Sequence, residues 1–199
     1  MTRKAIELNA DNPMYQALVD EVTNASDDKL VIIARSDINK KNDAIVPVGI
    51  RQGIYFYVAL DLGDKLAFLG KVTPEQIEKA KRNTLERAEI GDMFAILLGG
   101  GKPFKNWEFH GEEMIVVTSK NKTNGAGILF CEEFFEMMKA KIGGFTILPS
   151  SIHEIIIVPD SLEADMDALT NMVRSVNAAE VGDDEYLADF AFKASDFIR

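Results

Sequence analysis

The order of apolar and polar residues along the first half of the chain predicts short strands and two amphipathic helices. The strands expected there cover residues 4–8, 30–34, 45–50, 54–61 and 65–69. Pro47 places the third of these at a sheet edge or a bulge, because proline cannot donate to a strand ladder. Helical spacing of apolar residues predicts helices over residues 13–25 and 74–88. Thr73, Pro74 and Gln76 form a capping-box sequence at the start of the second helix.

The second half of the chain continues with alternating strands and helices. The strands expected there cover residues 114–119, 128–130, 145–148, 154–158 and 186–193. Asn124-Gly125 favours a hairpin between the first two of these, since both residues adopt positive φ angles readily. Helices are expected over residues 131–142 and 162–178. The apolar run Met93–Leu98 is too short for its periodicity to distinguish a helix from a strand.

This element order predicts an α+β protein with a mixed, mostly antiparallel sheet and helices packed on it. Residues 54–88 and 114–142 both follow the order strand, turn, strand, helix, which would suit a structural duplication. The loop that follows Gly99-Gly100-Gly101 divides the chain into an N-terminal half, residues 1–100, and a C-terminal half, residues 101–199. A chain of 199 residues fits one compact domain that contains both halves.

Composition and charge restrict the range of functions. The net charge of -10 and the absence of a dense basic patch argue against nucleic acid as a partner, since binding it requires clustered Lys and Arg. The single cysteine, Cys131, excludes an intrachain disulfide and a cysteine-rich zinc site. No stretch has the length of a membrane span, and the N-terminus lacks the apolar core of a signal peptide. We therefore expect an acidic cytoplasmic protein with no membrane partner.

Three stretches of the C-terminal half resemble a known family: MIVVTSK at residues 114–120, NGAGILF at residues 124–130 and LPSSIHE at residues 148–154. Together they are similar to a bacterial family of uncharacterised proteins with a domain of unknown function, common in Clostridia-type bacteria. The similarity extends over roughly residues 45–195. It implies a shared fold, with a helix in the region matching residues 91–98. It implies no activity, cofactor or catalytic residue.

The turn before the strand at residues 154–158 carries the strongest candidate chemistry. Ser150, Ser151, His153 and Glu154 place hydroxyls, a base and an acid within five residues. Catalytic triads need the base to reach the nucleophile and a third group to orient the base, usually from separate segments. The alternative is a proline-entered turn whose hydroxyls bond neighbouring N–H groups. The turn is the more common use of such a sequence, and the catalytic interpretation remains open beside it.

Other candidate motifs are incomplete. Gly99-Gly100-Gly101-Lys102 lacks the first glycine and the following Ser or Thr of a phosphate-binding loop, so we interpret it as a linker and expect no cofactor. His110 with Glu112 and Glu113, joined by His153, lacks the spacing of a metal-binding motif, and we expect no metal. Cys131 opens a helix, where the helix dipole can lower a thiol pKa, although a lone cysteine there is more often a small buried apolar residue.

The absence of any complete catalytic or cofactor motif leads to the first functional hypothesis. It is a non-enzymatic binding or interaction module with an unknown protein or small-molecule partner. The alternative is a small hydrolase or ligand-binding enzyme centred on the Ser150, Ser151, His153 and Glu154 turn.

Overall fold

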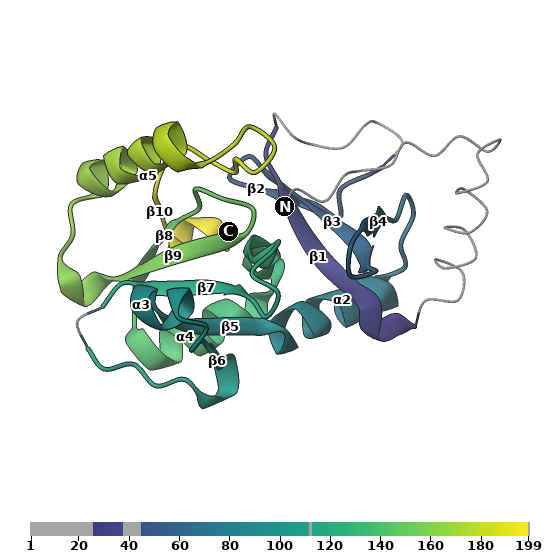
Figure 1. Ribbon diagram of the computed structural model, residues 1–199, viewed down its shortest axis with the longest axis horizontal. Coiled ribbons are helices and arrows are strands. Elements are labelled where there is room, and N and C mark those ends of the chain that lie inside the picture. The colour runs from purple at the N-terminus through teal and green to yellow at the C-terminus, as the bar shows by residue number, and fades with distance from the viewer. Residues whose placement is uncertain (1–25, 38–44, 112, 199) are drawn as a thin grey trace.

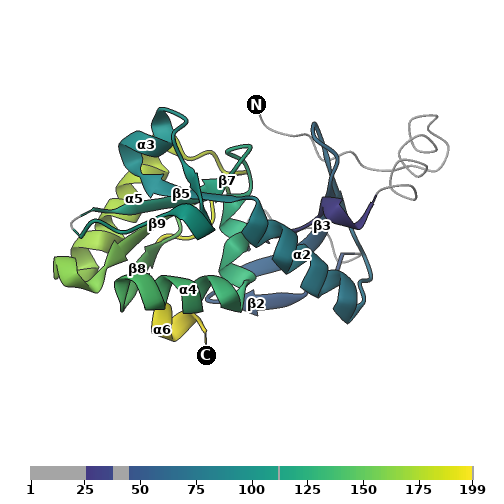
Figure 2. The ribbon, with the colours of Figure 1, turned by 90° about the horizontal axis from the view of Figure 1, so that it is seen from below.

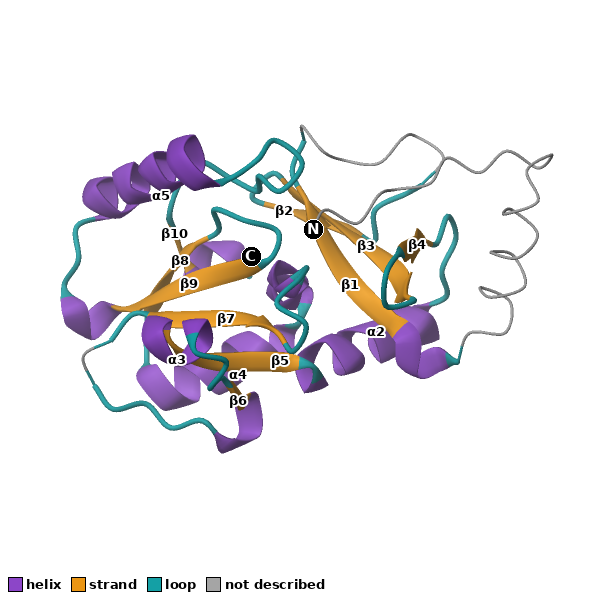
Figure 3. Cartoon of the chain, in the orientation of Figure 1, coloured by secondary structure: helices purple, strands orange, loops and turns teal. Residues whose placement is uncertain are grey.

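The structure is a computed structural model that describes residues 26–37, 45–111 and 113–198. The strand expected over residues 4–8 and the helix expected over residues 13–25 lie outside the described residues. The described part contains two antiparallel sheets with helices packed on them, which confirms the α+β class (Figure 1). Figure 3 separates the strands from the helices and shows the two sheets side by side.

The smaller sheet comes from the N-terminal part of the chain. Its strands are β1 (Leu30–Arg35), β2 (Gly49–Arg51), β3 (Ile54–Asp61) and β4 (Leu66–Phe68). The long β3 pairs with β1 along one edge and with both β2 and β4 along the other, so β1 is an outer strand of this sheet. Helix α2 (Pro74–Glu86) covers one face, and its N-terminus has the expected capping box between Thr73 and Gln76.

The larger sheet has the order β10-β8-β9-β7-β5-β6, and all its pairs are antiparallel. Its strands are β5 (Ala88–Asp92), β6 (Lys102–Pro103), β7 (Ile115–Ser119), β8 (Phe145–Leu148), β9 (Glu154–Pro159) and β10 (Phe192–Lys193). Helices α4 (Glu132–Ile142) and α6 (Ala194–Phe197) lie on one side of it, and α3 (Met93–Leu97) and α5 (Met166–Glu180) lie on the other (Figure 2).

One hydrophobic core joins the two sheets. It contains Ile32 and Phe56 from the smaller sheet, Ala80 from α2, Phe134 from α4 and Ile155 from the larger sheet. Burial of large apolar side chains is the dominant favourable term in folding. The two sheets are therefore stabilised by shared packing.

The segment between the sheets is a 3-10 helix, η3 (Gly125–Phe130), all six residues of which are buried. Gly127 sits directly on β1, and a Cβ atom built there would lie 1.9 Å from the carbonyl oxygen of Ile32. Only glycine allows two backbones to approach this closely. At the other end of η3, the Phe130 ring stacks on Phe56 with centroids 5.1 Å apart.

A small group of charged side chains covers the end of η3. The guanidinium of Arg51 lies 4.9 Å from the Phe130 ring centroid, and the ammonium of Lys81 lies 5.2 Å from it. Both cations also contact the carboxylate of Glu132, with Lys81 at 3.0 Å. Burial opposes ionisation of Glu132, but these hydrogen bonds outweigh it and lower the pKa of the carboxyl. The group links β2, α2 and the first turn of α4.

Two predictions in the middle of the chain were wrong. Residues 128–130 are not a strand, and Asn124-Gly125 is not a hairpin turn, because η3 begins here, with Asn124 at a φ of 57°. The amides of Gly125 and Ala126 donate instead to the carbonyls of His153 and Ile152, at 2.9 and 3.2 Å. Since β5 and β9 already flank β7, a returning strand has no free edge there. The strand-turn-strand-helix order therefore holds only for residues 54–86.

Other boundaries differ from the predictions by a few residues. Strand β5 was missed because it follows α2 after the single residue Arg87, so the helical pattern appeared to continue into it. The strand expected over residues 45–50 is replaced by the short strand β2, which begins after Pro47. Of the strand expected over residues 186–193, only Phe192 and Lys193 form a strand. Helix α5 begins at Met166, where the Asp165 carboxylate accepts a hydrogen bond from the Ala168 amide at 2.9 Å.

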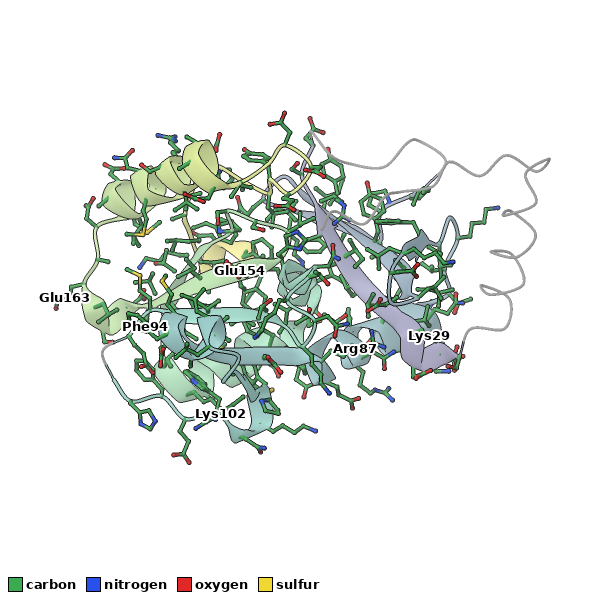
Figure 4. The ribbon with its side chains drawn as sticks, in the orientation of Figure 1. Lys29, Arg87, Phe94, Lys102, Glu154 and Glu163 are labelled. Atoms are coloured by element: carbon green, nitrogen blue, oxygen red, sulfur yellow. The ribbon has the colours of Figure 1, made fainter. Side chains whose placement is uncertain are left out.

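The ambiguous run at Met93–Leu98 is helical over Met93–Leu97, as the family resemblance implied. The carboxylate of Asp92 caps this helix by accepting from the Ala95 amide at 2.8 Å. Ile96 is its one buried residue, whereas Phe94, Leu97 and Leu98 are exposed. Figure 4 labels Phe94 at this helix. None of the described helices is long and apolar enough to cross a membrane.

Replacing Gly127 with alanine tests the contact between the two sheets. We expect Gly127→Ala to lower the free energy of unfolding by about 2 kcal/mol or more, because the added methyl overlaps the Ile32 carbonyl. Gly100→Ala is the control, since its Cβ would approach no atom closer than 3.4 Å. Urea unfolding of both variants measures the difference. Equal stabilities would contradict the close contact.

Candidate functional site

The turn that precedes β9 is held mainly by main-chain hydrogen bonds. The hydroxyl oxygen of Ser151 accepts a hydrogen bond from the backbone N–H of His153 at 3.0 Å. The carbonyl of Ser150 accepts from the Leu187 amide at 3.1 Å, and Ser151 forms an isolated bridge with Tyr186. Glu154 is exposed at the start of β9, where Figure 4 labels it. These contacts resemble those of a turn whose hydroxyl satisfies a nearby N–H.

Both ring nitrogens of His153 are occupied by neighbours from separate segments. Nδ1 accepts from the backbone N–H of Asn124 at 3.1 Å, and Nε2 lies 3.3 Å from a carboxylate oxygen of Glu185. Nδ1 therefore acts as an acceptor, and the neutral imidazole carries its proton on Nε2, facing Glu185. Within the described residues, no hydrogen bond joins the imidazole to a serine hydroxyl. A catalytic role for Ser150, Ser151, His153 and Glu154 stays a prediction.

A pocket of about 330 Å³ opens where the β1 edge faces the loop that follows β7, and no residue of the Ser150–Glu154 turn lines it. Val31 and Ile33 of β1 and Leu66 of β4 form its apolar wall. The opposite wall is the polar loop from Thr118 to Gly125. Its size lies at the lower end of the range for small-molecule sites, and its mixture of apolar and polar walls is typical of such sites.

Three cationic residues line the pocket, Lys29, Arg87 and Lys120, and they lie together at one end of it because Arg87 is hydrogen-bonded to the main chain of Asp28 and of Lys120. Arg87 contacts the Asp61 carboxylate at 3.2 Å and donates to the Asp28 carbonyl at 2.6 Å. Figure 4 shows Arg87 and Lys29 where the end of α2 meets the start of β1. The ammonium groups of Lys29 and Lys120 have no hydrogen-bond or ion-pair partner among residues 26–37, 45–111 and 113–198.

Two acidic side chains, Asp28 and Asp61, also line this end of the pocket. The hydrogen bond from the Ser26 hydroxyl lowers the pKa of Asp28, so this carboxyl is ionised at neutral pH. Asp61 is engaged by Arg87. The cations therefore outnumber the acids around the pocket by one, although the whole chain has a net charge of -10.

The loop wall is fixed by its own hydrogen bonds. The Ser119 hydroxyl donates to the Thr123 carbonyl at 2.7 Å, and the Lys120 amide donates to the Arg87 carbonyl at 2.8 Å. Lys122 and Asn124 both have positive φ angles, 56° and 57°, which are uncommon for residues other than glycine. Such backbone conformations cost energy and persist where the surroundings hold them, often at binding sites.

The other candidates from the sequence lie away from this pocket. No group of three His, Cys, Asp or Glu side chains is placed to hold a metal ion in the described part of the chain, and Glu112 lies outside that part. His110 is exposed in a loop. Cys131 is 2 % exposed, and burial raises the pKa of its thiol to about 12. The helix dipole thus does not activate the Cys131 thiol, and of the two interpretations the structure agrees with the small buried apolar residue.

Sequence reasoning missed the pocket because its residues come from segments far apart in the chain. Lys29, Arg87 and Lys120 belong to no common motif, and a single sequence carries no sign that they meet. The polar stretch 119–124 between a strand and a buried segment was the one local signal. It was interpreted as a hairpin turn.

Comparison with known proteins gives a family and no activity. The model of DUF5688, described as a family of unknown function, matches residues 64–193. This range includes α2, the pocket loop and the LPSSIHE segment, but not β1. No curated protein and no solved structure matches the chain.

The buried thiol of Cys131 gives a direct test of the packing around it. We expect no reaction with a disulfide reagent at pH 8 in the folded protein, because the thiol is protonated and shielded from solvent. Complete reaction is expected in urea. Absorbance of the released thiolate measures both rates, and fast labelling without denaturant would contradict this environment.

Proposed function

The chain belongs to the DUF5688 family, whose function is unknown, and we propose that it is a non-enzymatic module that binds a small anionic molecule. The ligand lies in the pocket between β1 and the Thr118–Gly125 loop. The observation that carries the proposal is the pair of unpartnered ammonium groups, Lys29 and Lys120, at one end of this pocket.

Unpaired cations at a concave site are consistent with recognition of an anion. Charged groups inside a cleft with apolar walls interact more strongly than they do in bulk water. Arg87 adds a third cation, and its contact with Asp61 holds the guanidinium in place. The apolar wall of Val31, Ile33 and Leu66 supplies surface for a short carbon chain attached to the anionic group.

The chemistry of the lining supports binding over catalysis. The described residues that line the pocket include no histidine and no cysteine, the usual bases and nucleophiles near neutral pH. Of the two carboxylates present, Asp61 is paired with Arg87. His153 is one residue layer behind the loop, with its ring nitrogens directed at Asn124 and Glu185.

Removing the unpaired charges tests the proposal. We expect Lys29→Met and Lys120→Met each to weaken binding of ethyl phosphate about threefold to tenfold, which corresponds to the loss of one partly solvated charge contact. Titration calorimetry at low ionic strength is the appropriate measurement, because salt screens exposed charges. Lys105→Met is the matched control, since Lys105 is exposed and does not line the pocket. Absence of ethyl phosphate binding to the unmodified protein, or equal losses in all three variants, would contradict the proposal.

The alternative hypothesis, a hydrolase at the Ser150–Glu154 turn, has its own test. We expect no turnover in a screen of activated esters, phosphoesters and glycosides, because the His153 ring contacts no hydroxyl in this part of the structure. Reproducible turnover that disappears in both Ser151→Ala and His153→Ala would overturn the non-enzymatic proposal. Thermal unfolding of the two variants separates loss of activity from loss of folding.

A further inference from the structure

At the end of β1, in contact with the loop wall of the pocket, lies a buried cation, Arg35. The residue is 8 % exposed, and its guanidinium carbon lies 5.4 Å from the centroid of the Phe68 ring. One terminal nitrogen, Nη1, donates to the Ala34 carbonyl at 2.8 Å and to Oδ1 of Asn124 at 3.2 Å. Arg35 therefore contacts a residue that lines the pocket.

Arg35 is positively charged at neutral pH despite its burial. Desolvation lowers its pKa to about 10, while the nearby Tyr57 and Asp184 act in the opposite direction. No carboxylate forms a salt bridge with the guanidinium within the part of the chain that the structure describes. The Asn124 amide oxygen and the aromatic face of Phe68 are thus among its closest favourable contacts.

The Arg35 contact determines which way the Asn124 amide faces. A guanidinium has only donors, so the amide atom that meets it has to be the acceptor, Oδ1. The NH₂ group then points away from Arg35. It has no acceptor among the described residues, and Asn124 lines the pocket. The backbone of Asn124 is fixed as well, because its N–H donates to the ring of His153 at 3.1 Å.

We propose that Asn124, oriented by Arg35, presents its amide NH₂ into the pocket and binds a carboxylate or other acceptor group of the ligand. The proposal rests on the anion-binding function proposed above and extends it to the second end of the ligand. One end is an anionic head held by Lys29, Arg87 and Lys120, and the other is an acceptor group held by Asn124. The expected class of ligand is a short molecule with two anionic or acceptor ends. Arg35 is a positioning residue that acts through Asn124.

Two probes of similar size separate the two ends. Phosphoglycolate carries a phosphate and a carboxylate, whereas ethyl phosphate carries the same phosphate and a methyl group. We expect the unmodified protein to bind phosphoglycolate about tenfold more tightly than ethyl phosphate, as a charged hydrogen bond would provide.

Substitutions at Asn124 can be chosen so that the fold is retained. The φ of 57° suits glycine better than any other residue, so Asn124→Gly removes the amide without backbone strain. Asn124→Asp keeps the size of the side chain and replaces the NH₂ donor with a second acceptor oxygen. We expect Asn124→Gly to remove the preference for phosphoglycolate and Asn124→Asp to reverse it through charge repulsion. The affinity for ethyl phosphate is measured on each variant as well, so that the ratio of the two affinities isolates the acceptor end of the ligand from any change at the phosphate end.

Arg35 is tested by its dependence on Asn124. We expect Arg35→Lys to reduce the preference for phosphoglycolate, because a lysine ammonium does not reproduce the fixed contact with Oδ1. In the Asn124→Gly background the same substitution should leave the ratio of the two affinities unchanged. A purely structural role for Arg35 would instead lower the stability and both affinities together in either background.

The possible outcomes separate this inference from the proposed function. If both probes bind with equal affinity, or if Asn124→Asp and Asn124→Gly keep the full preference, the inference about Asn124 is overturned while anion binding stands. If neither probe binds, the anion-binding function fails and the inference fails with it. Both the inference about Asn124 and the anion-binding function are supported by one combined result. In that result the Asn124 variants lose the preference for phosphoglycolate, whereas Lys120→Met keeps this preference and binds both probes more weakly.

Discussion

The contact between Gly127 and Ile32 is the constraint on which the rest of this structure depends. It allows the buried 3-10 helix η3 to lie directly against the backbone of β1. Because η3 also stacks Phe130 on Phe56 and leads into α4, one short segment connects the smaller sheet to the larger one. A side chain at position 127 would separate the two sheets. The shared core on both sides of η3 would then lose its packing.

The same contact also positions the pocket. The loop before η3 cannot move away from β1 while Gly127 holds its end, and hydrogen bonds of Asn124 and Gly125 to His153 hold it from the other side. The Ser150–Glu154 turn therefore has a structural role, because its residue His153 supports the loop that forms one wall of the pocket. The chain as a whole is acidic, whereas the pocket has an excess of cationic groups. The electrostatic potential in the pocket therefore attracts an anion.

The sequence was sufficient to predict the elements whose signals are local. The capping box at Thr73 and the strong periodicity of residues 132–142 gave two helices correctly, and the buried strands at residues 30–35 and 145–148 were found from their apolar runs. These signals, with the other strands and helices, were enough for the α+β class. They depend on neighbours in the chain, so no knowledge of the tertiary structure was needed.

The elements that were missed depend on contacts between distant segments. Asn124-Gly125 has the composition of a hairpin turn, but both edges of β7 are already paired, and the chain forms η3 instead. Strand β5 follows a helix after one residue, and only its pairing with β7 identifies it as a strand. The pocket is a further case, because Lys29, Arg87 and Lys120 are brought together by the fold alone. His153 was identified from the sequence as a candidate residue. Its partner Glu185 was not, because Glu185 lies 32 residues further along the chain and no sequence spacing indicates the pair.

The central claim is that an anionic ligand binds between β1 and the Thr118–Gly125 loop. The most direct measurement is a titration of the ¹⁵N-labelled protein with phosphoglycolate, followed by the backbone amide shifts. The account predicts saturable shifts confined to the segments that line the pocket, residues 28–33, 61–66, 84–88 and 118–125, with smaller changes at His153 behind the loop. Shifts centred on Ser150–Ile152, or on the exposed face of α3, or no shifts at millimolar ligand, would contradict it.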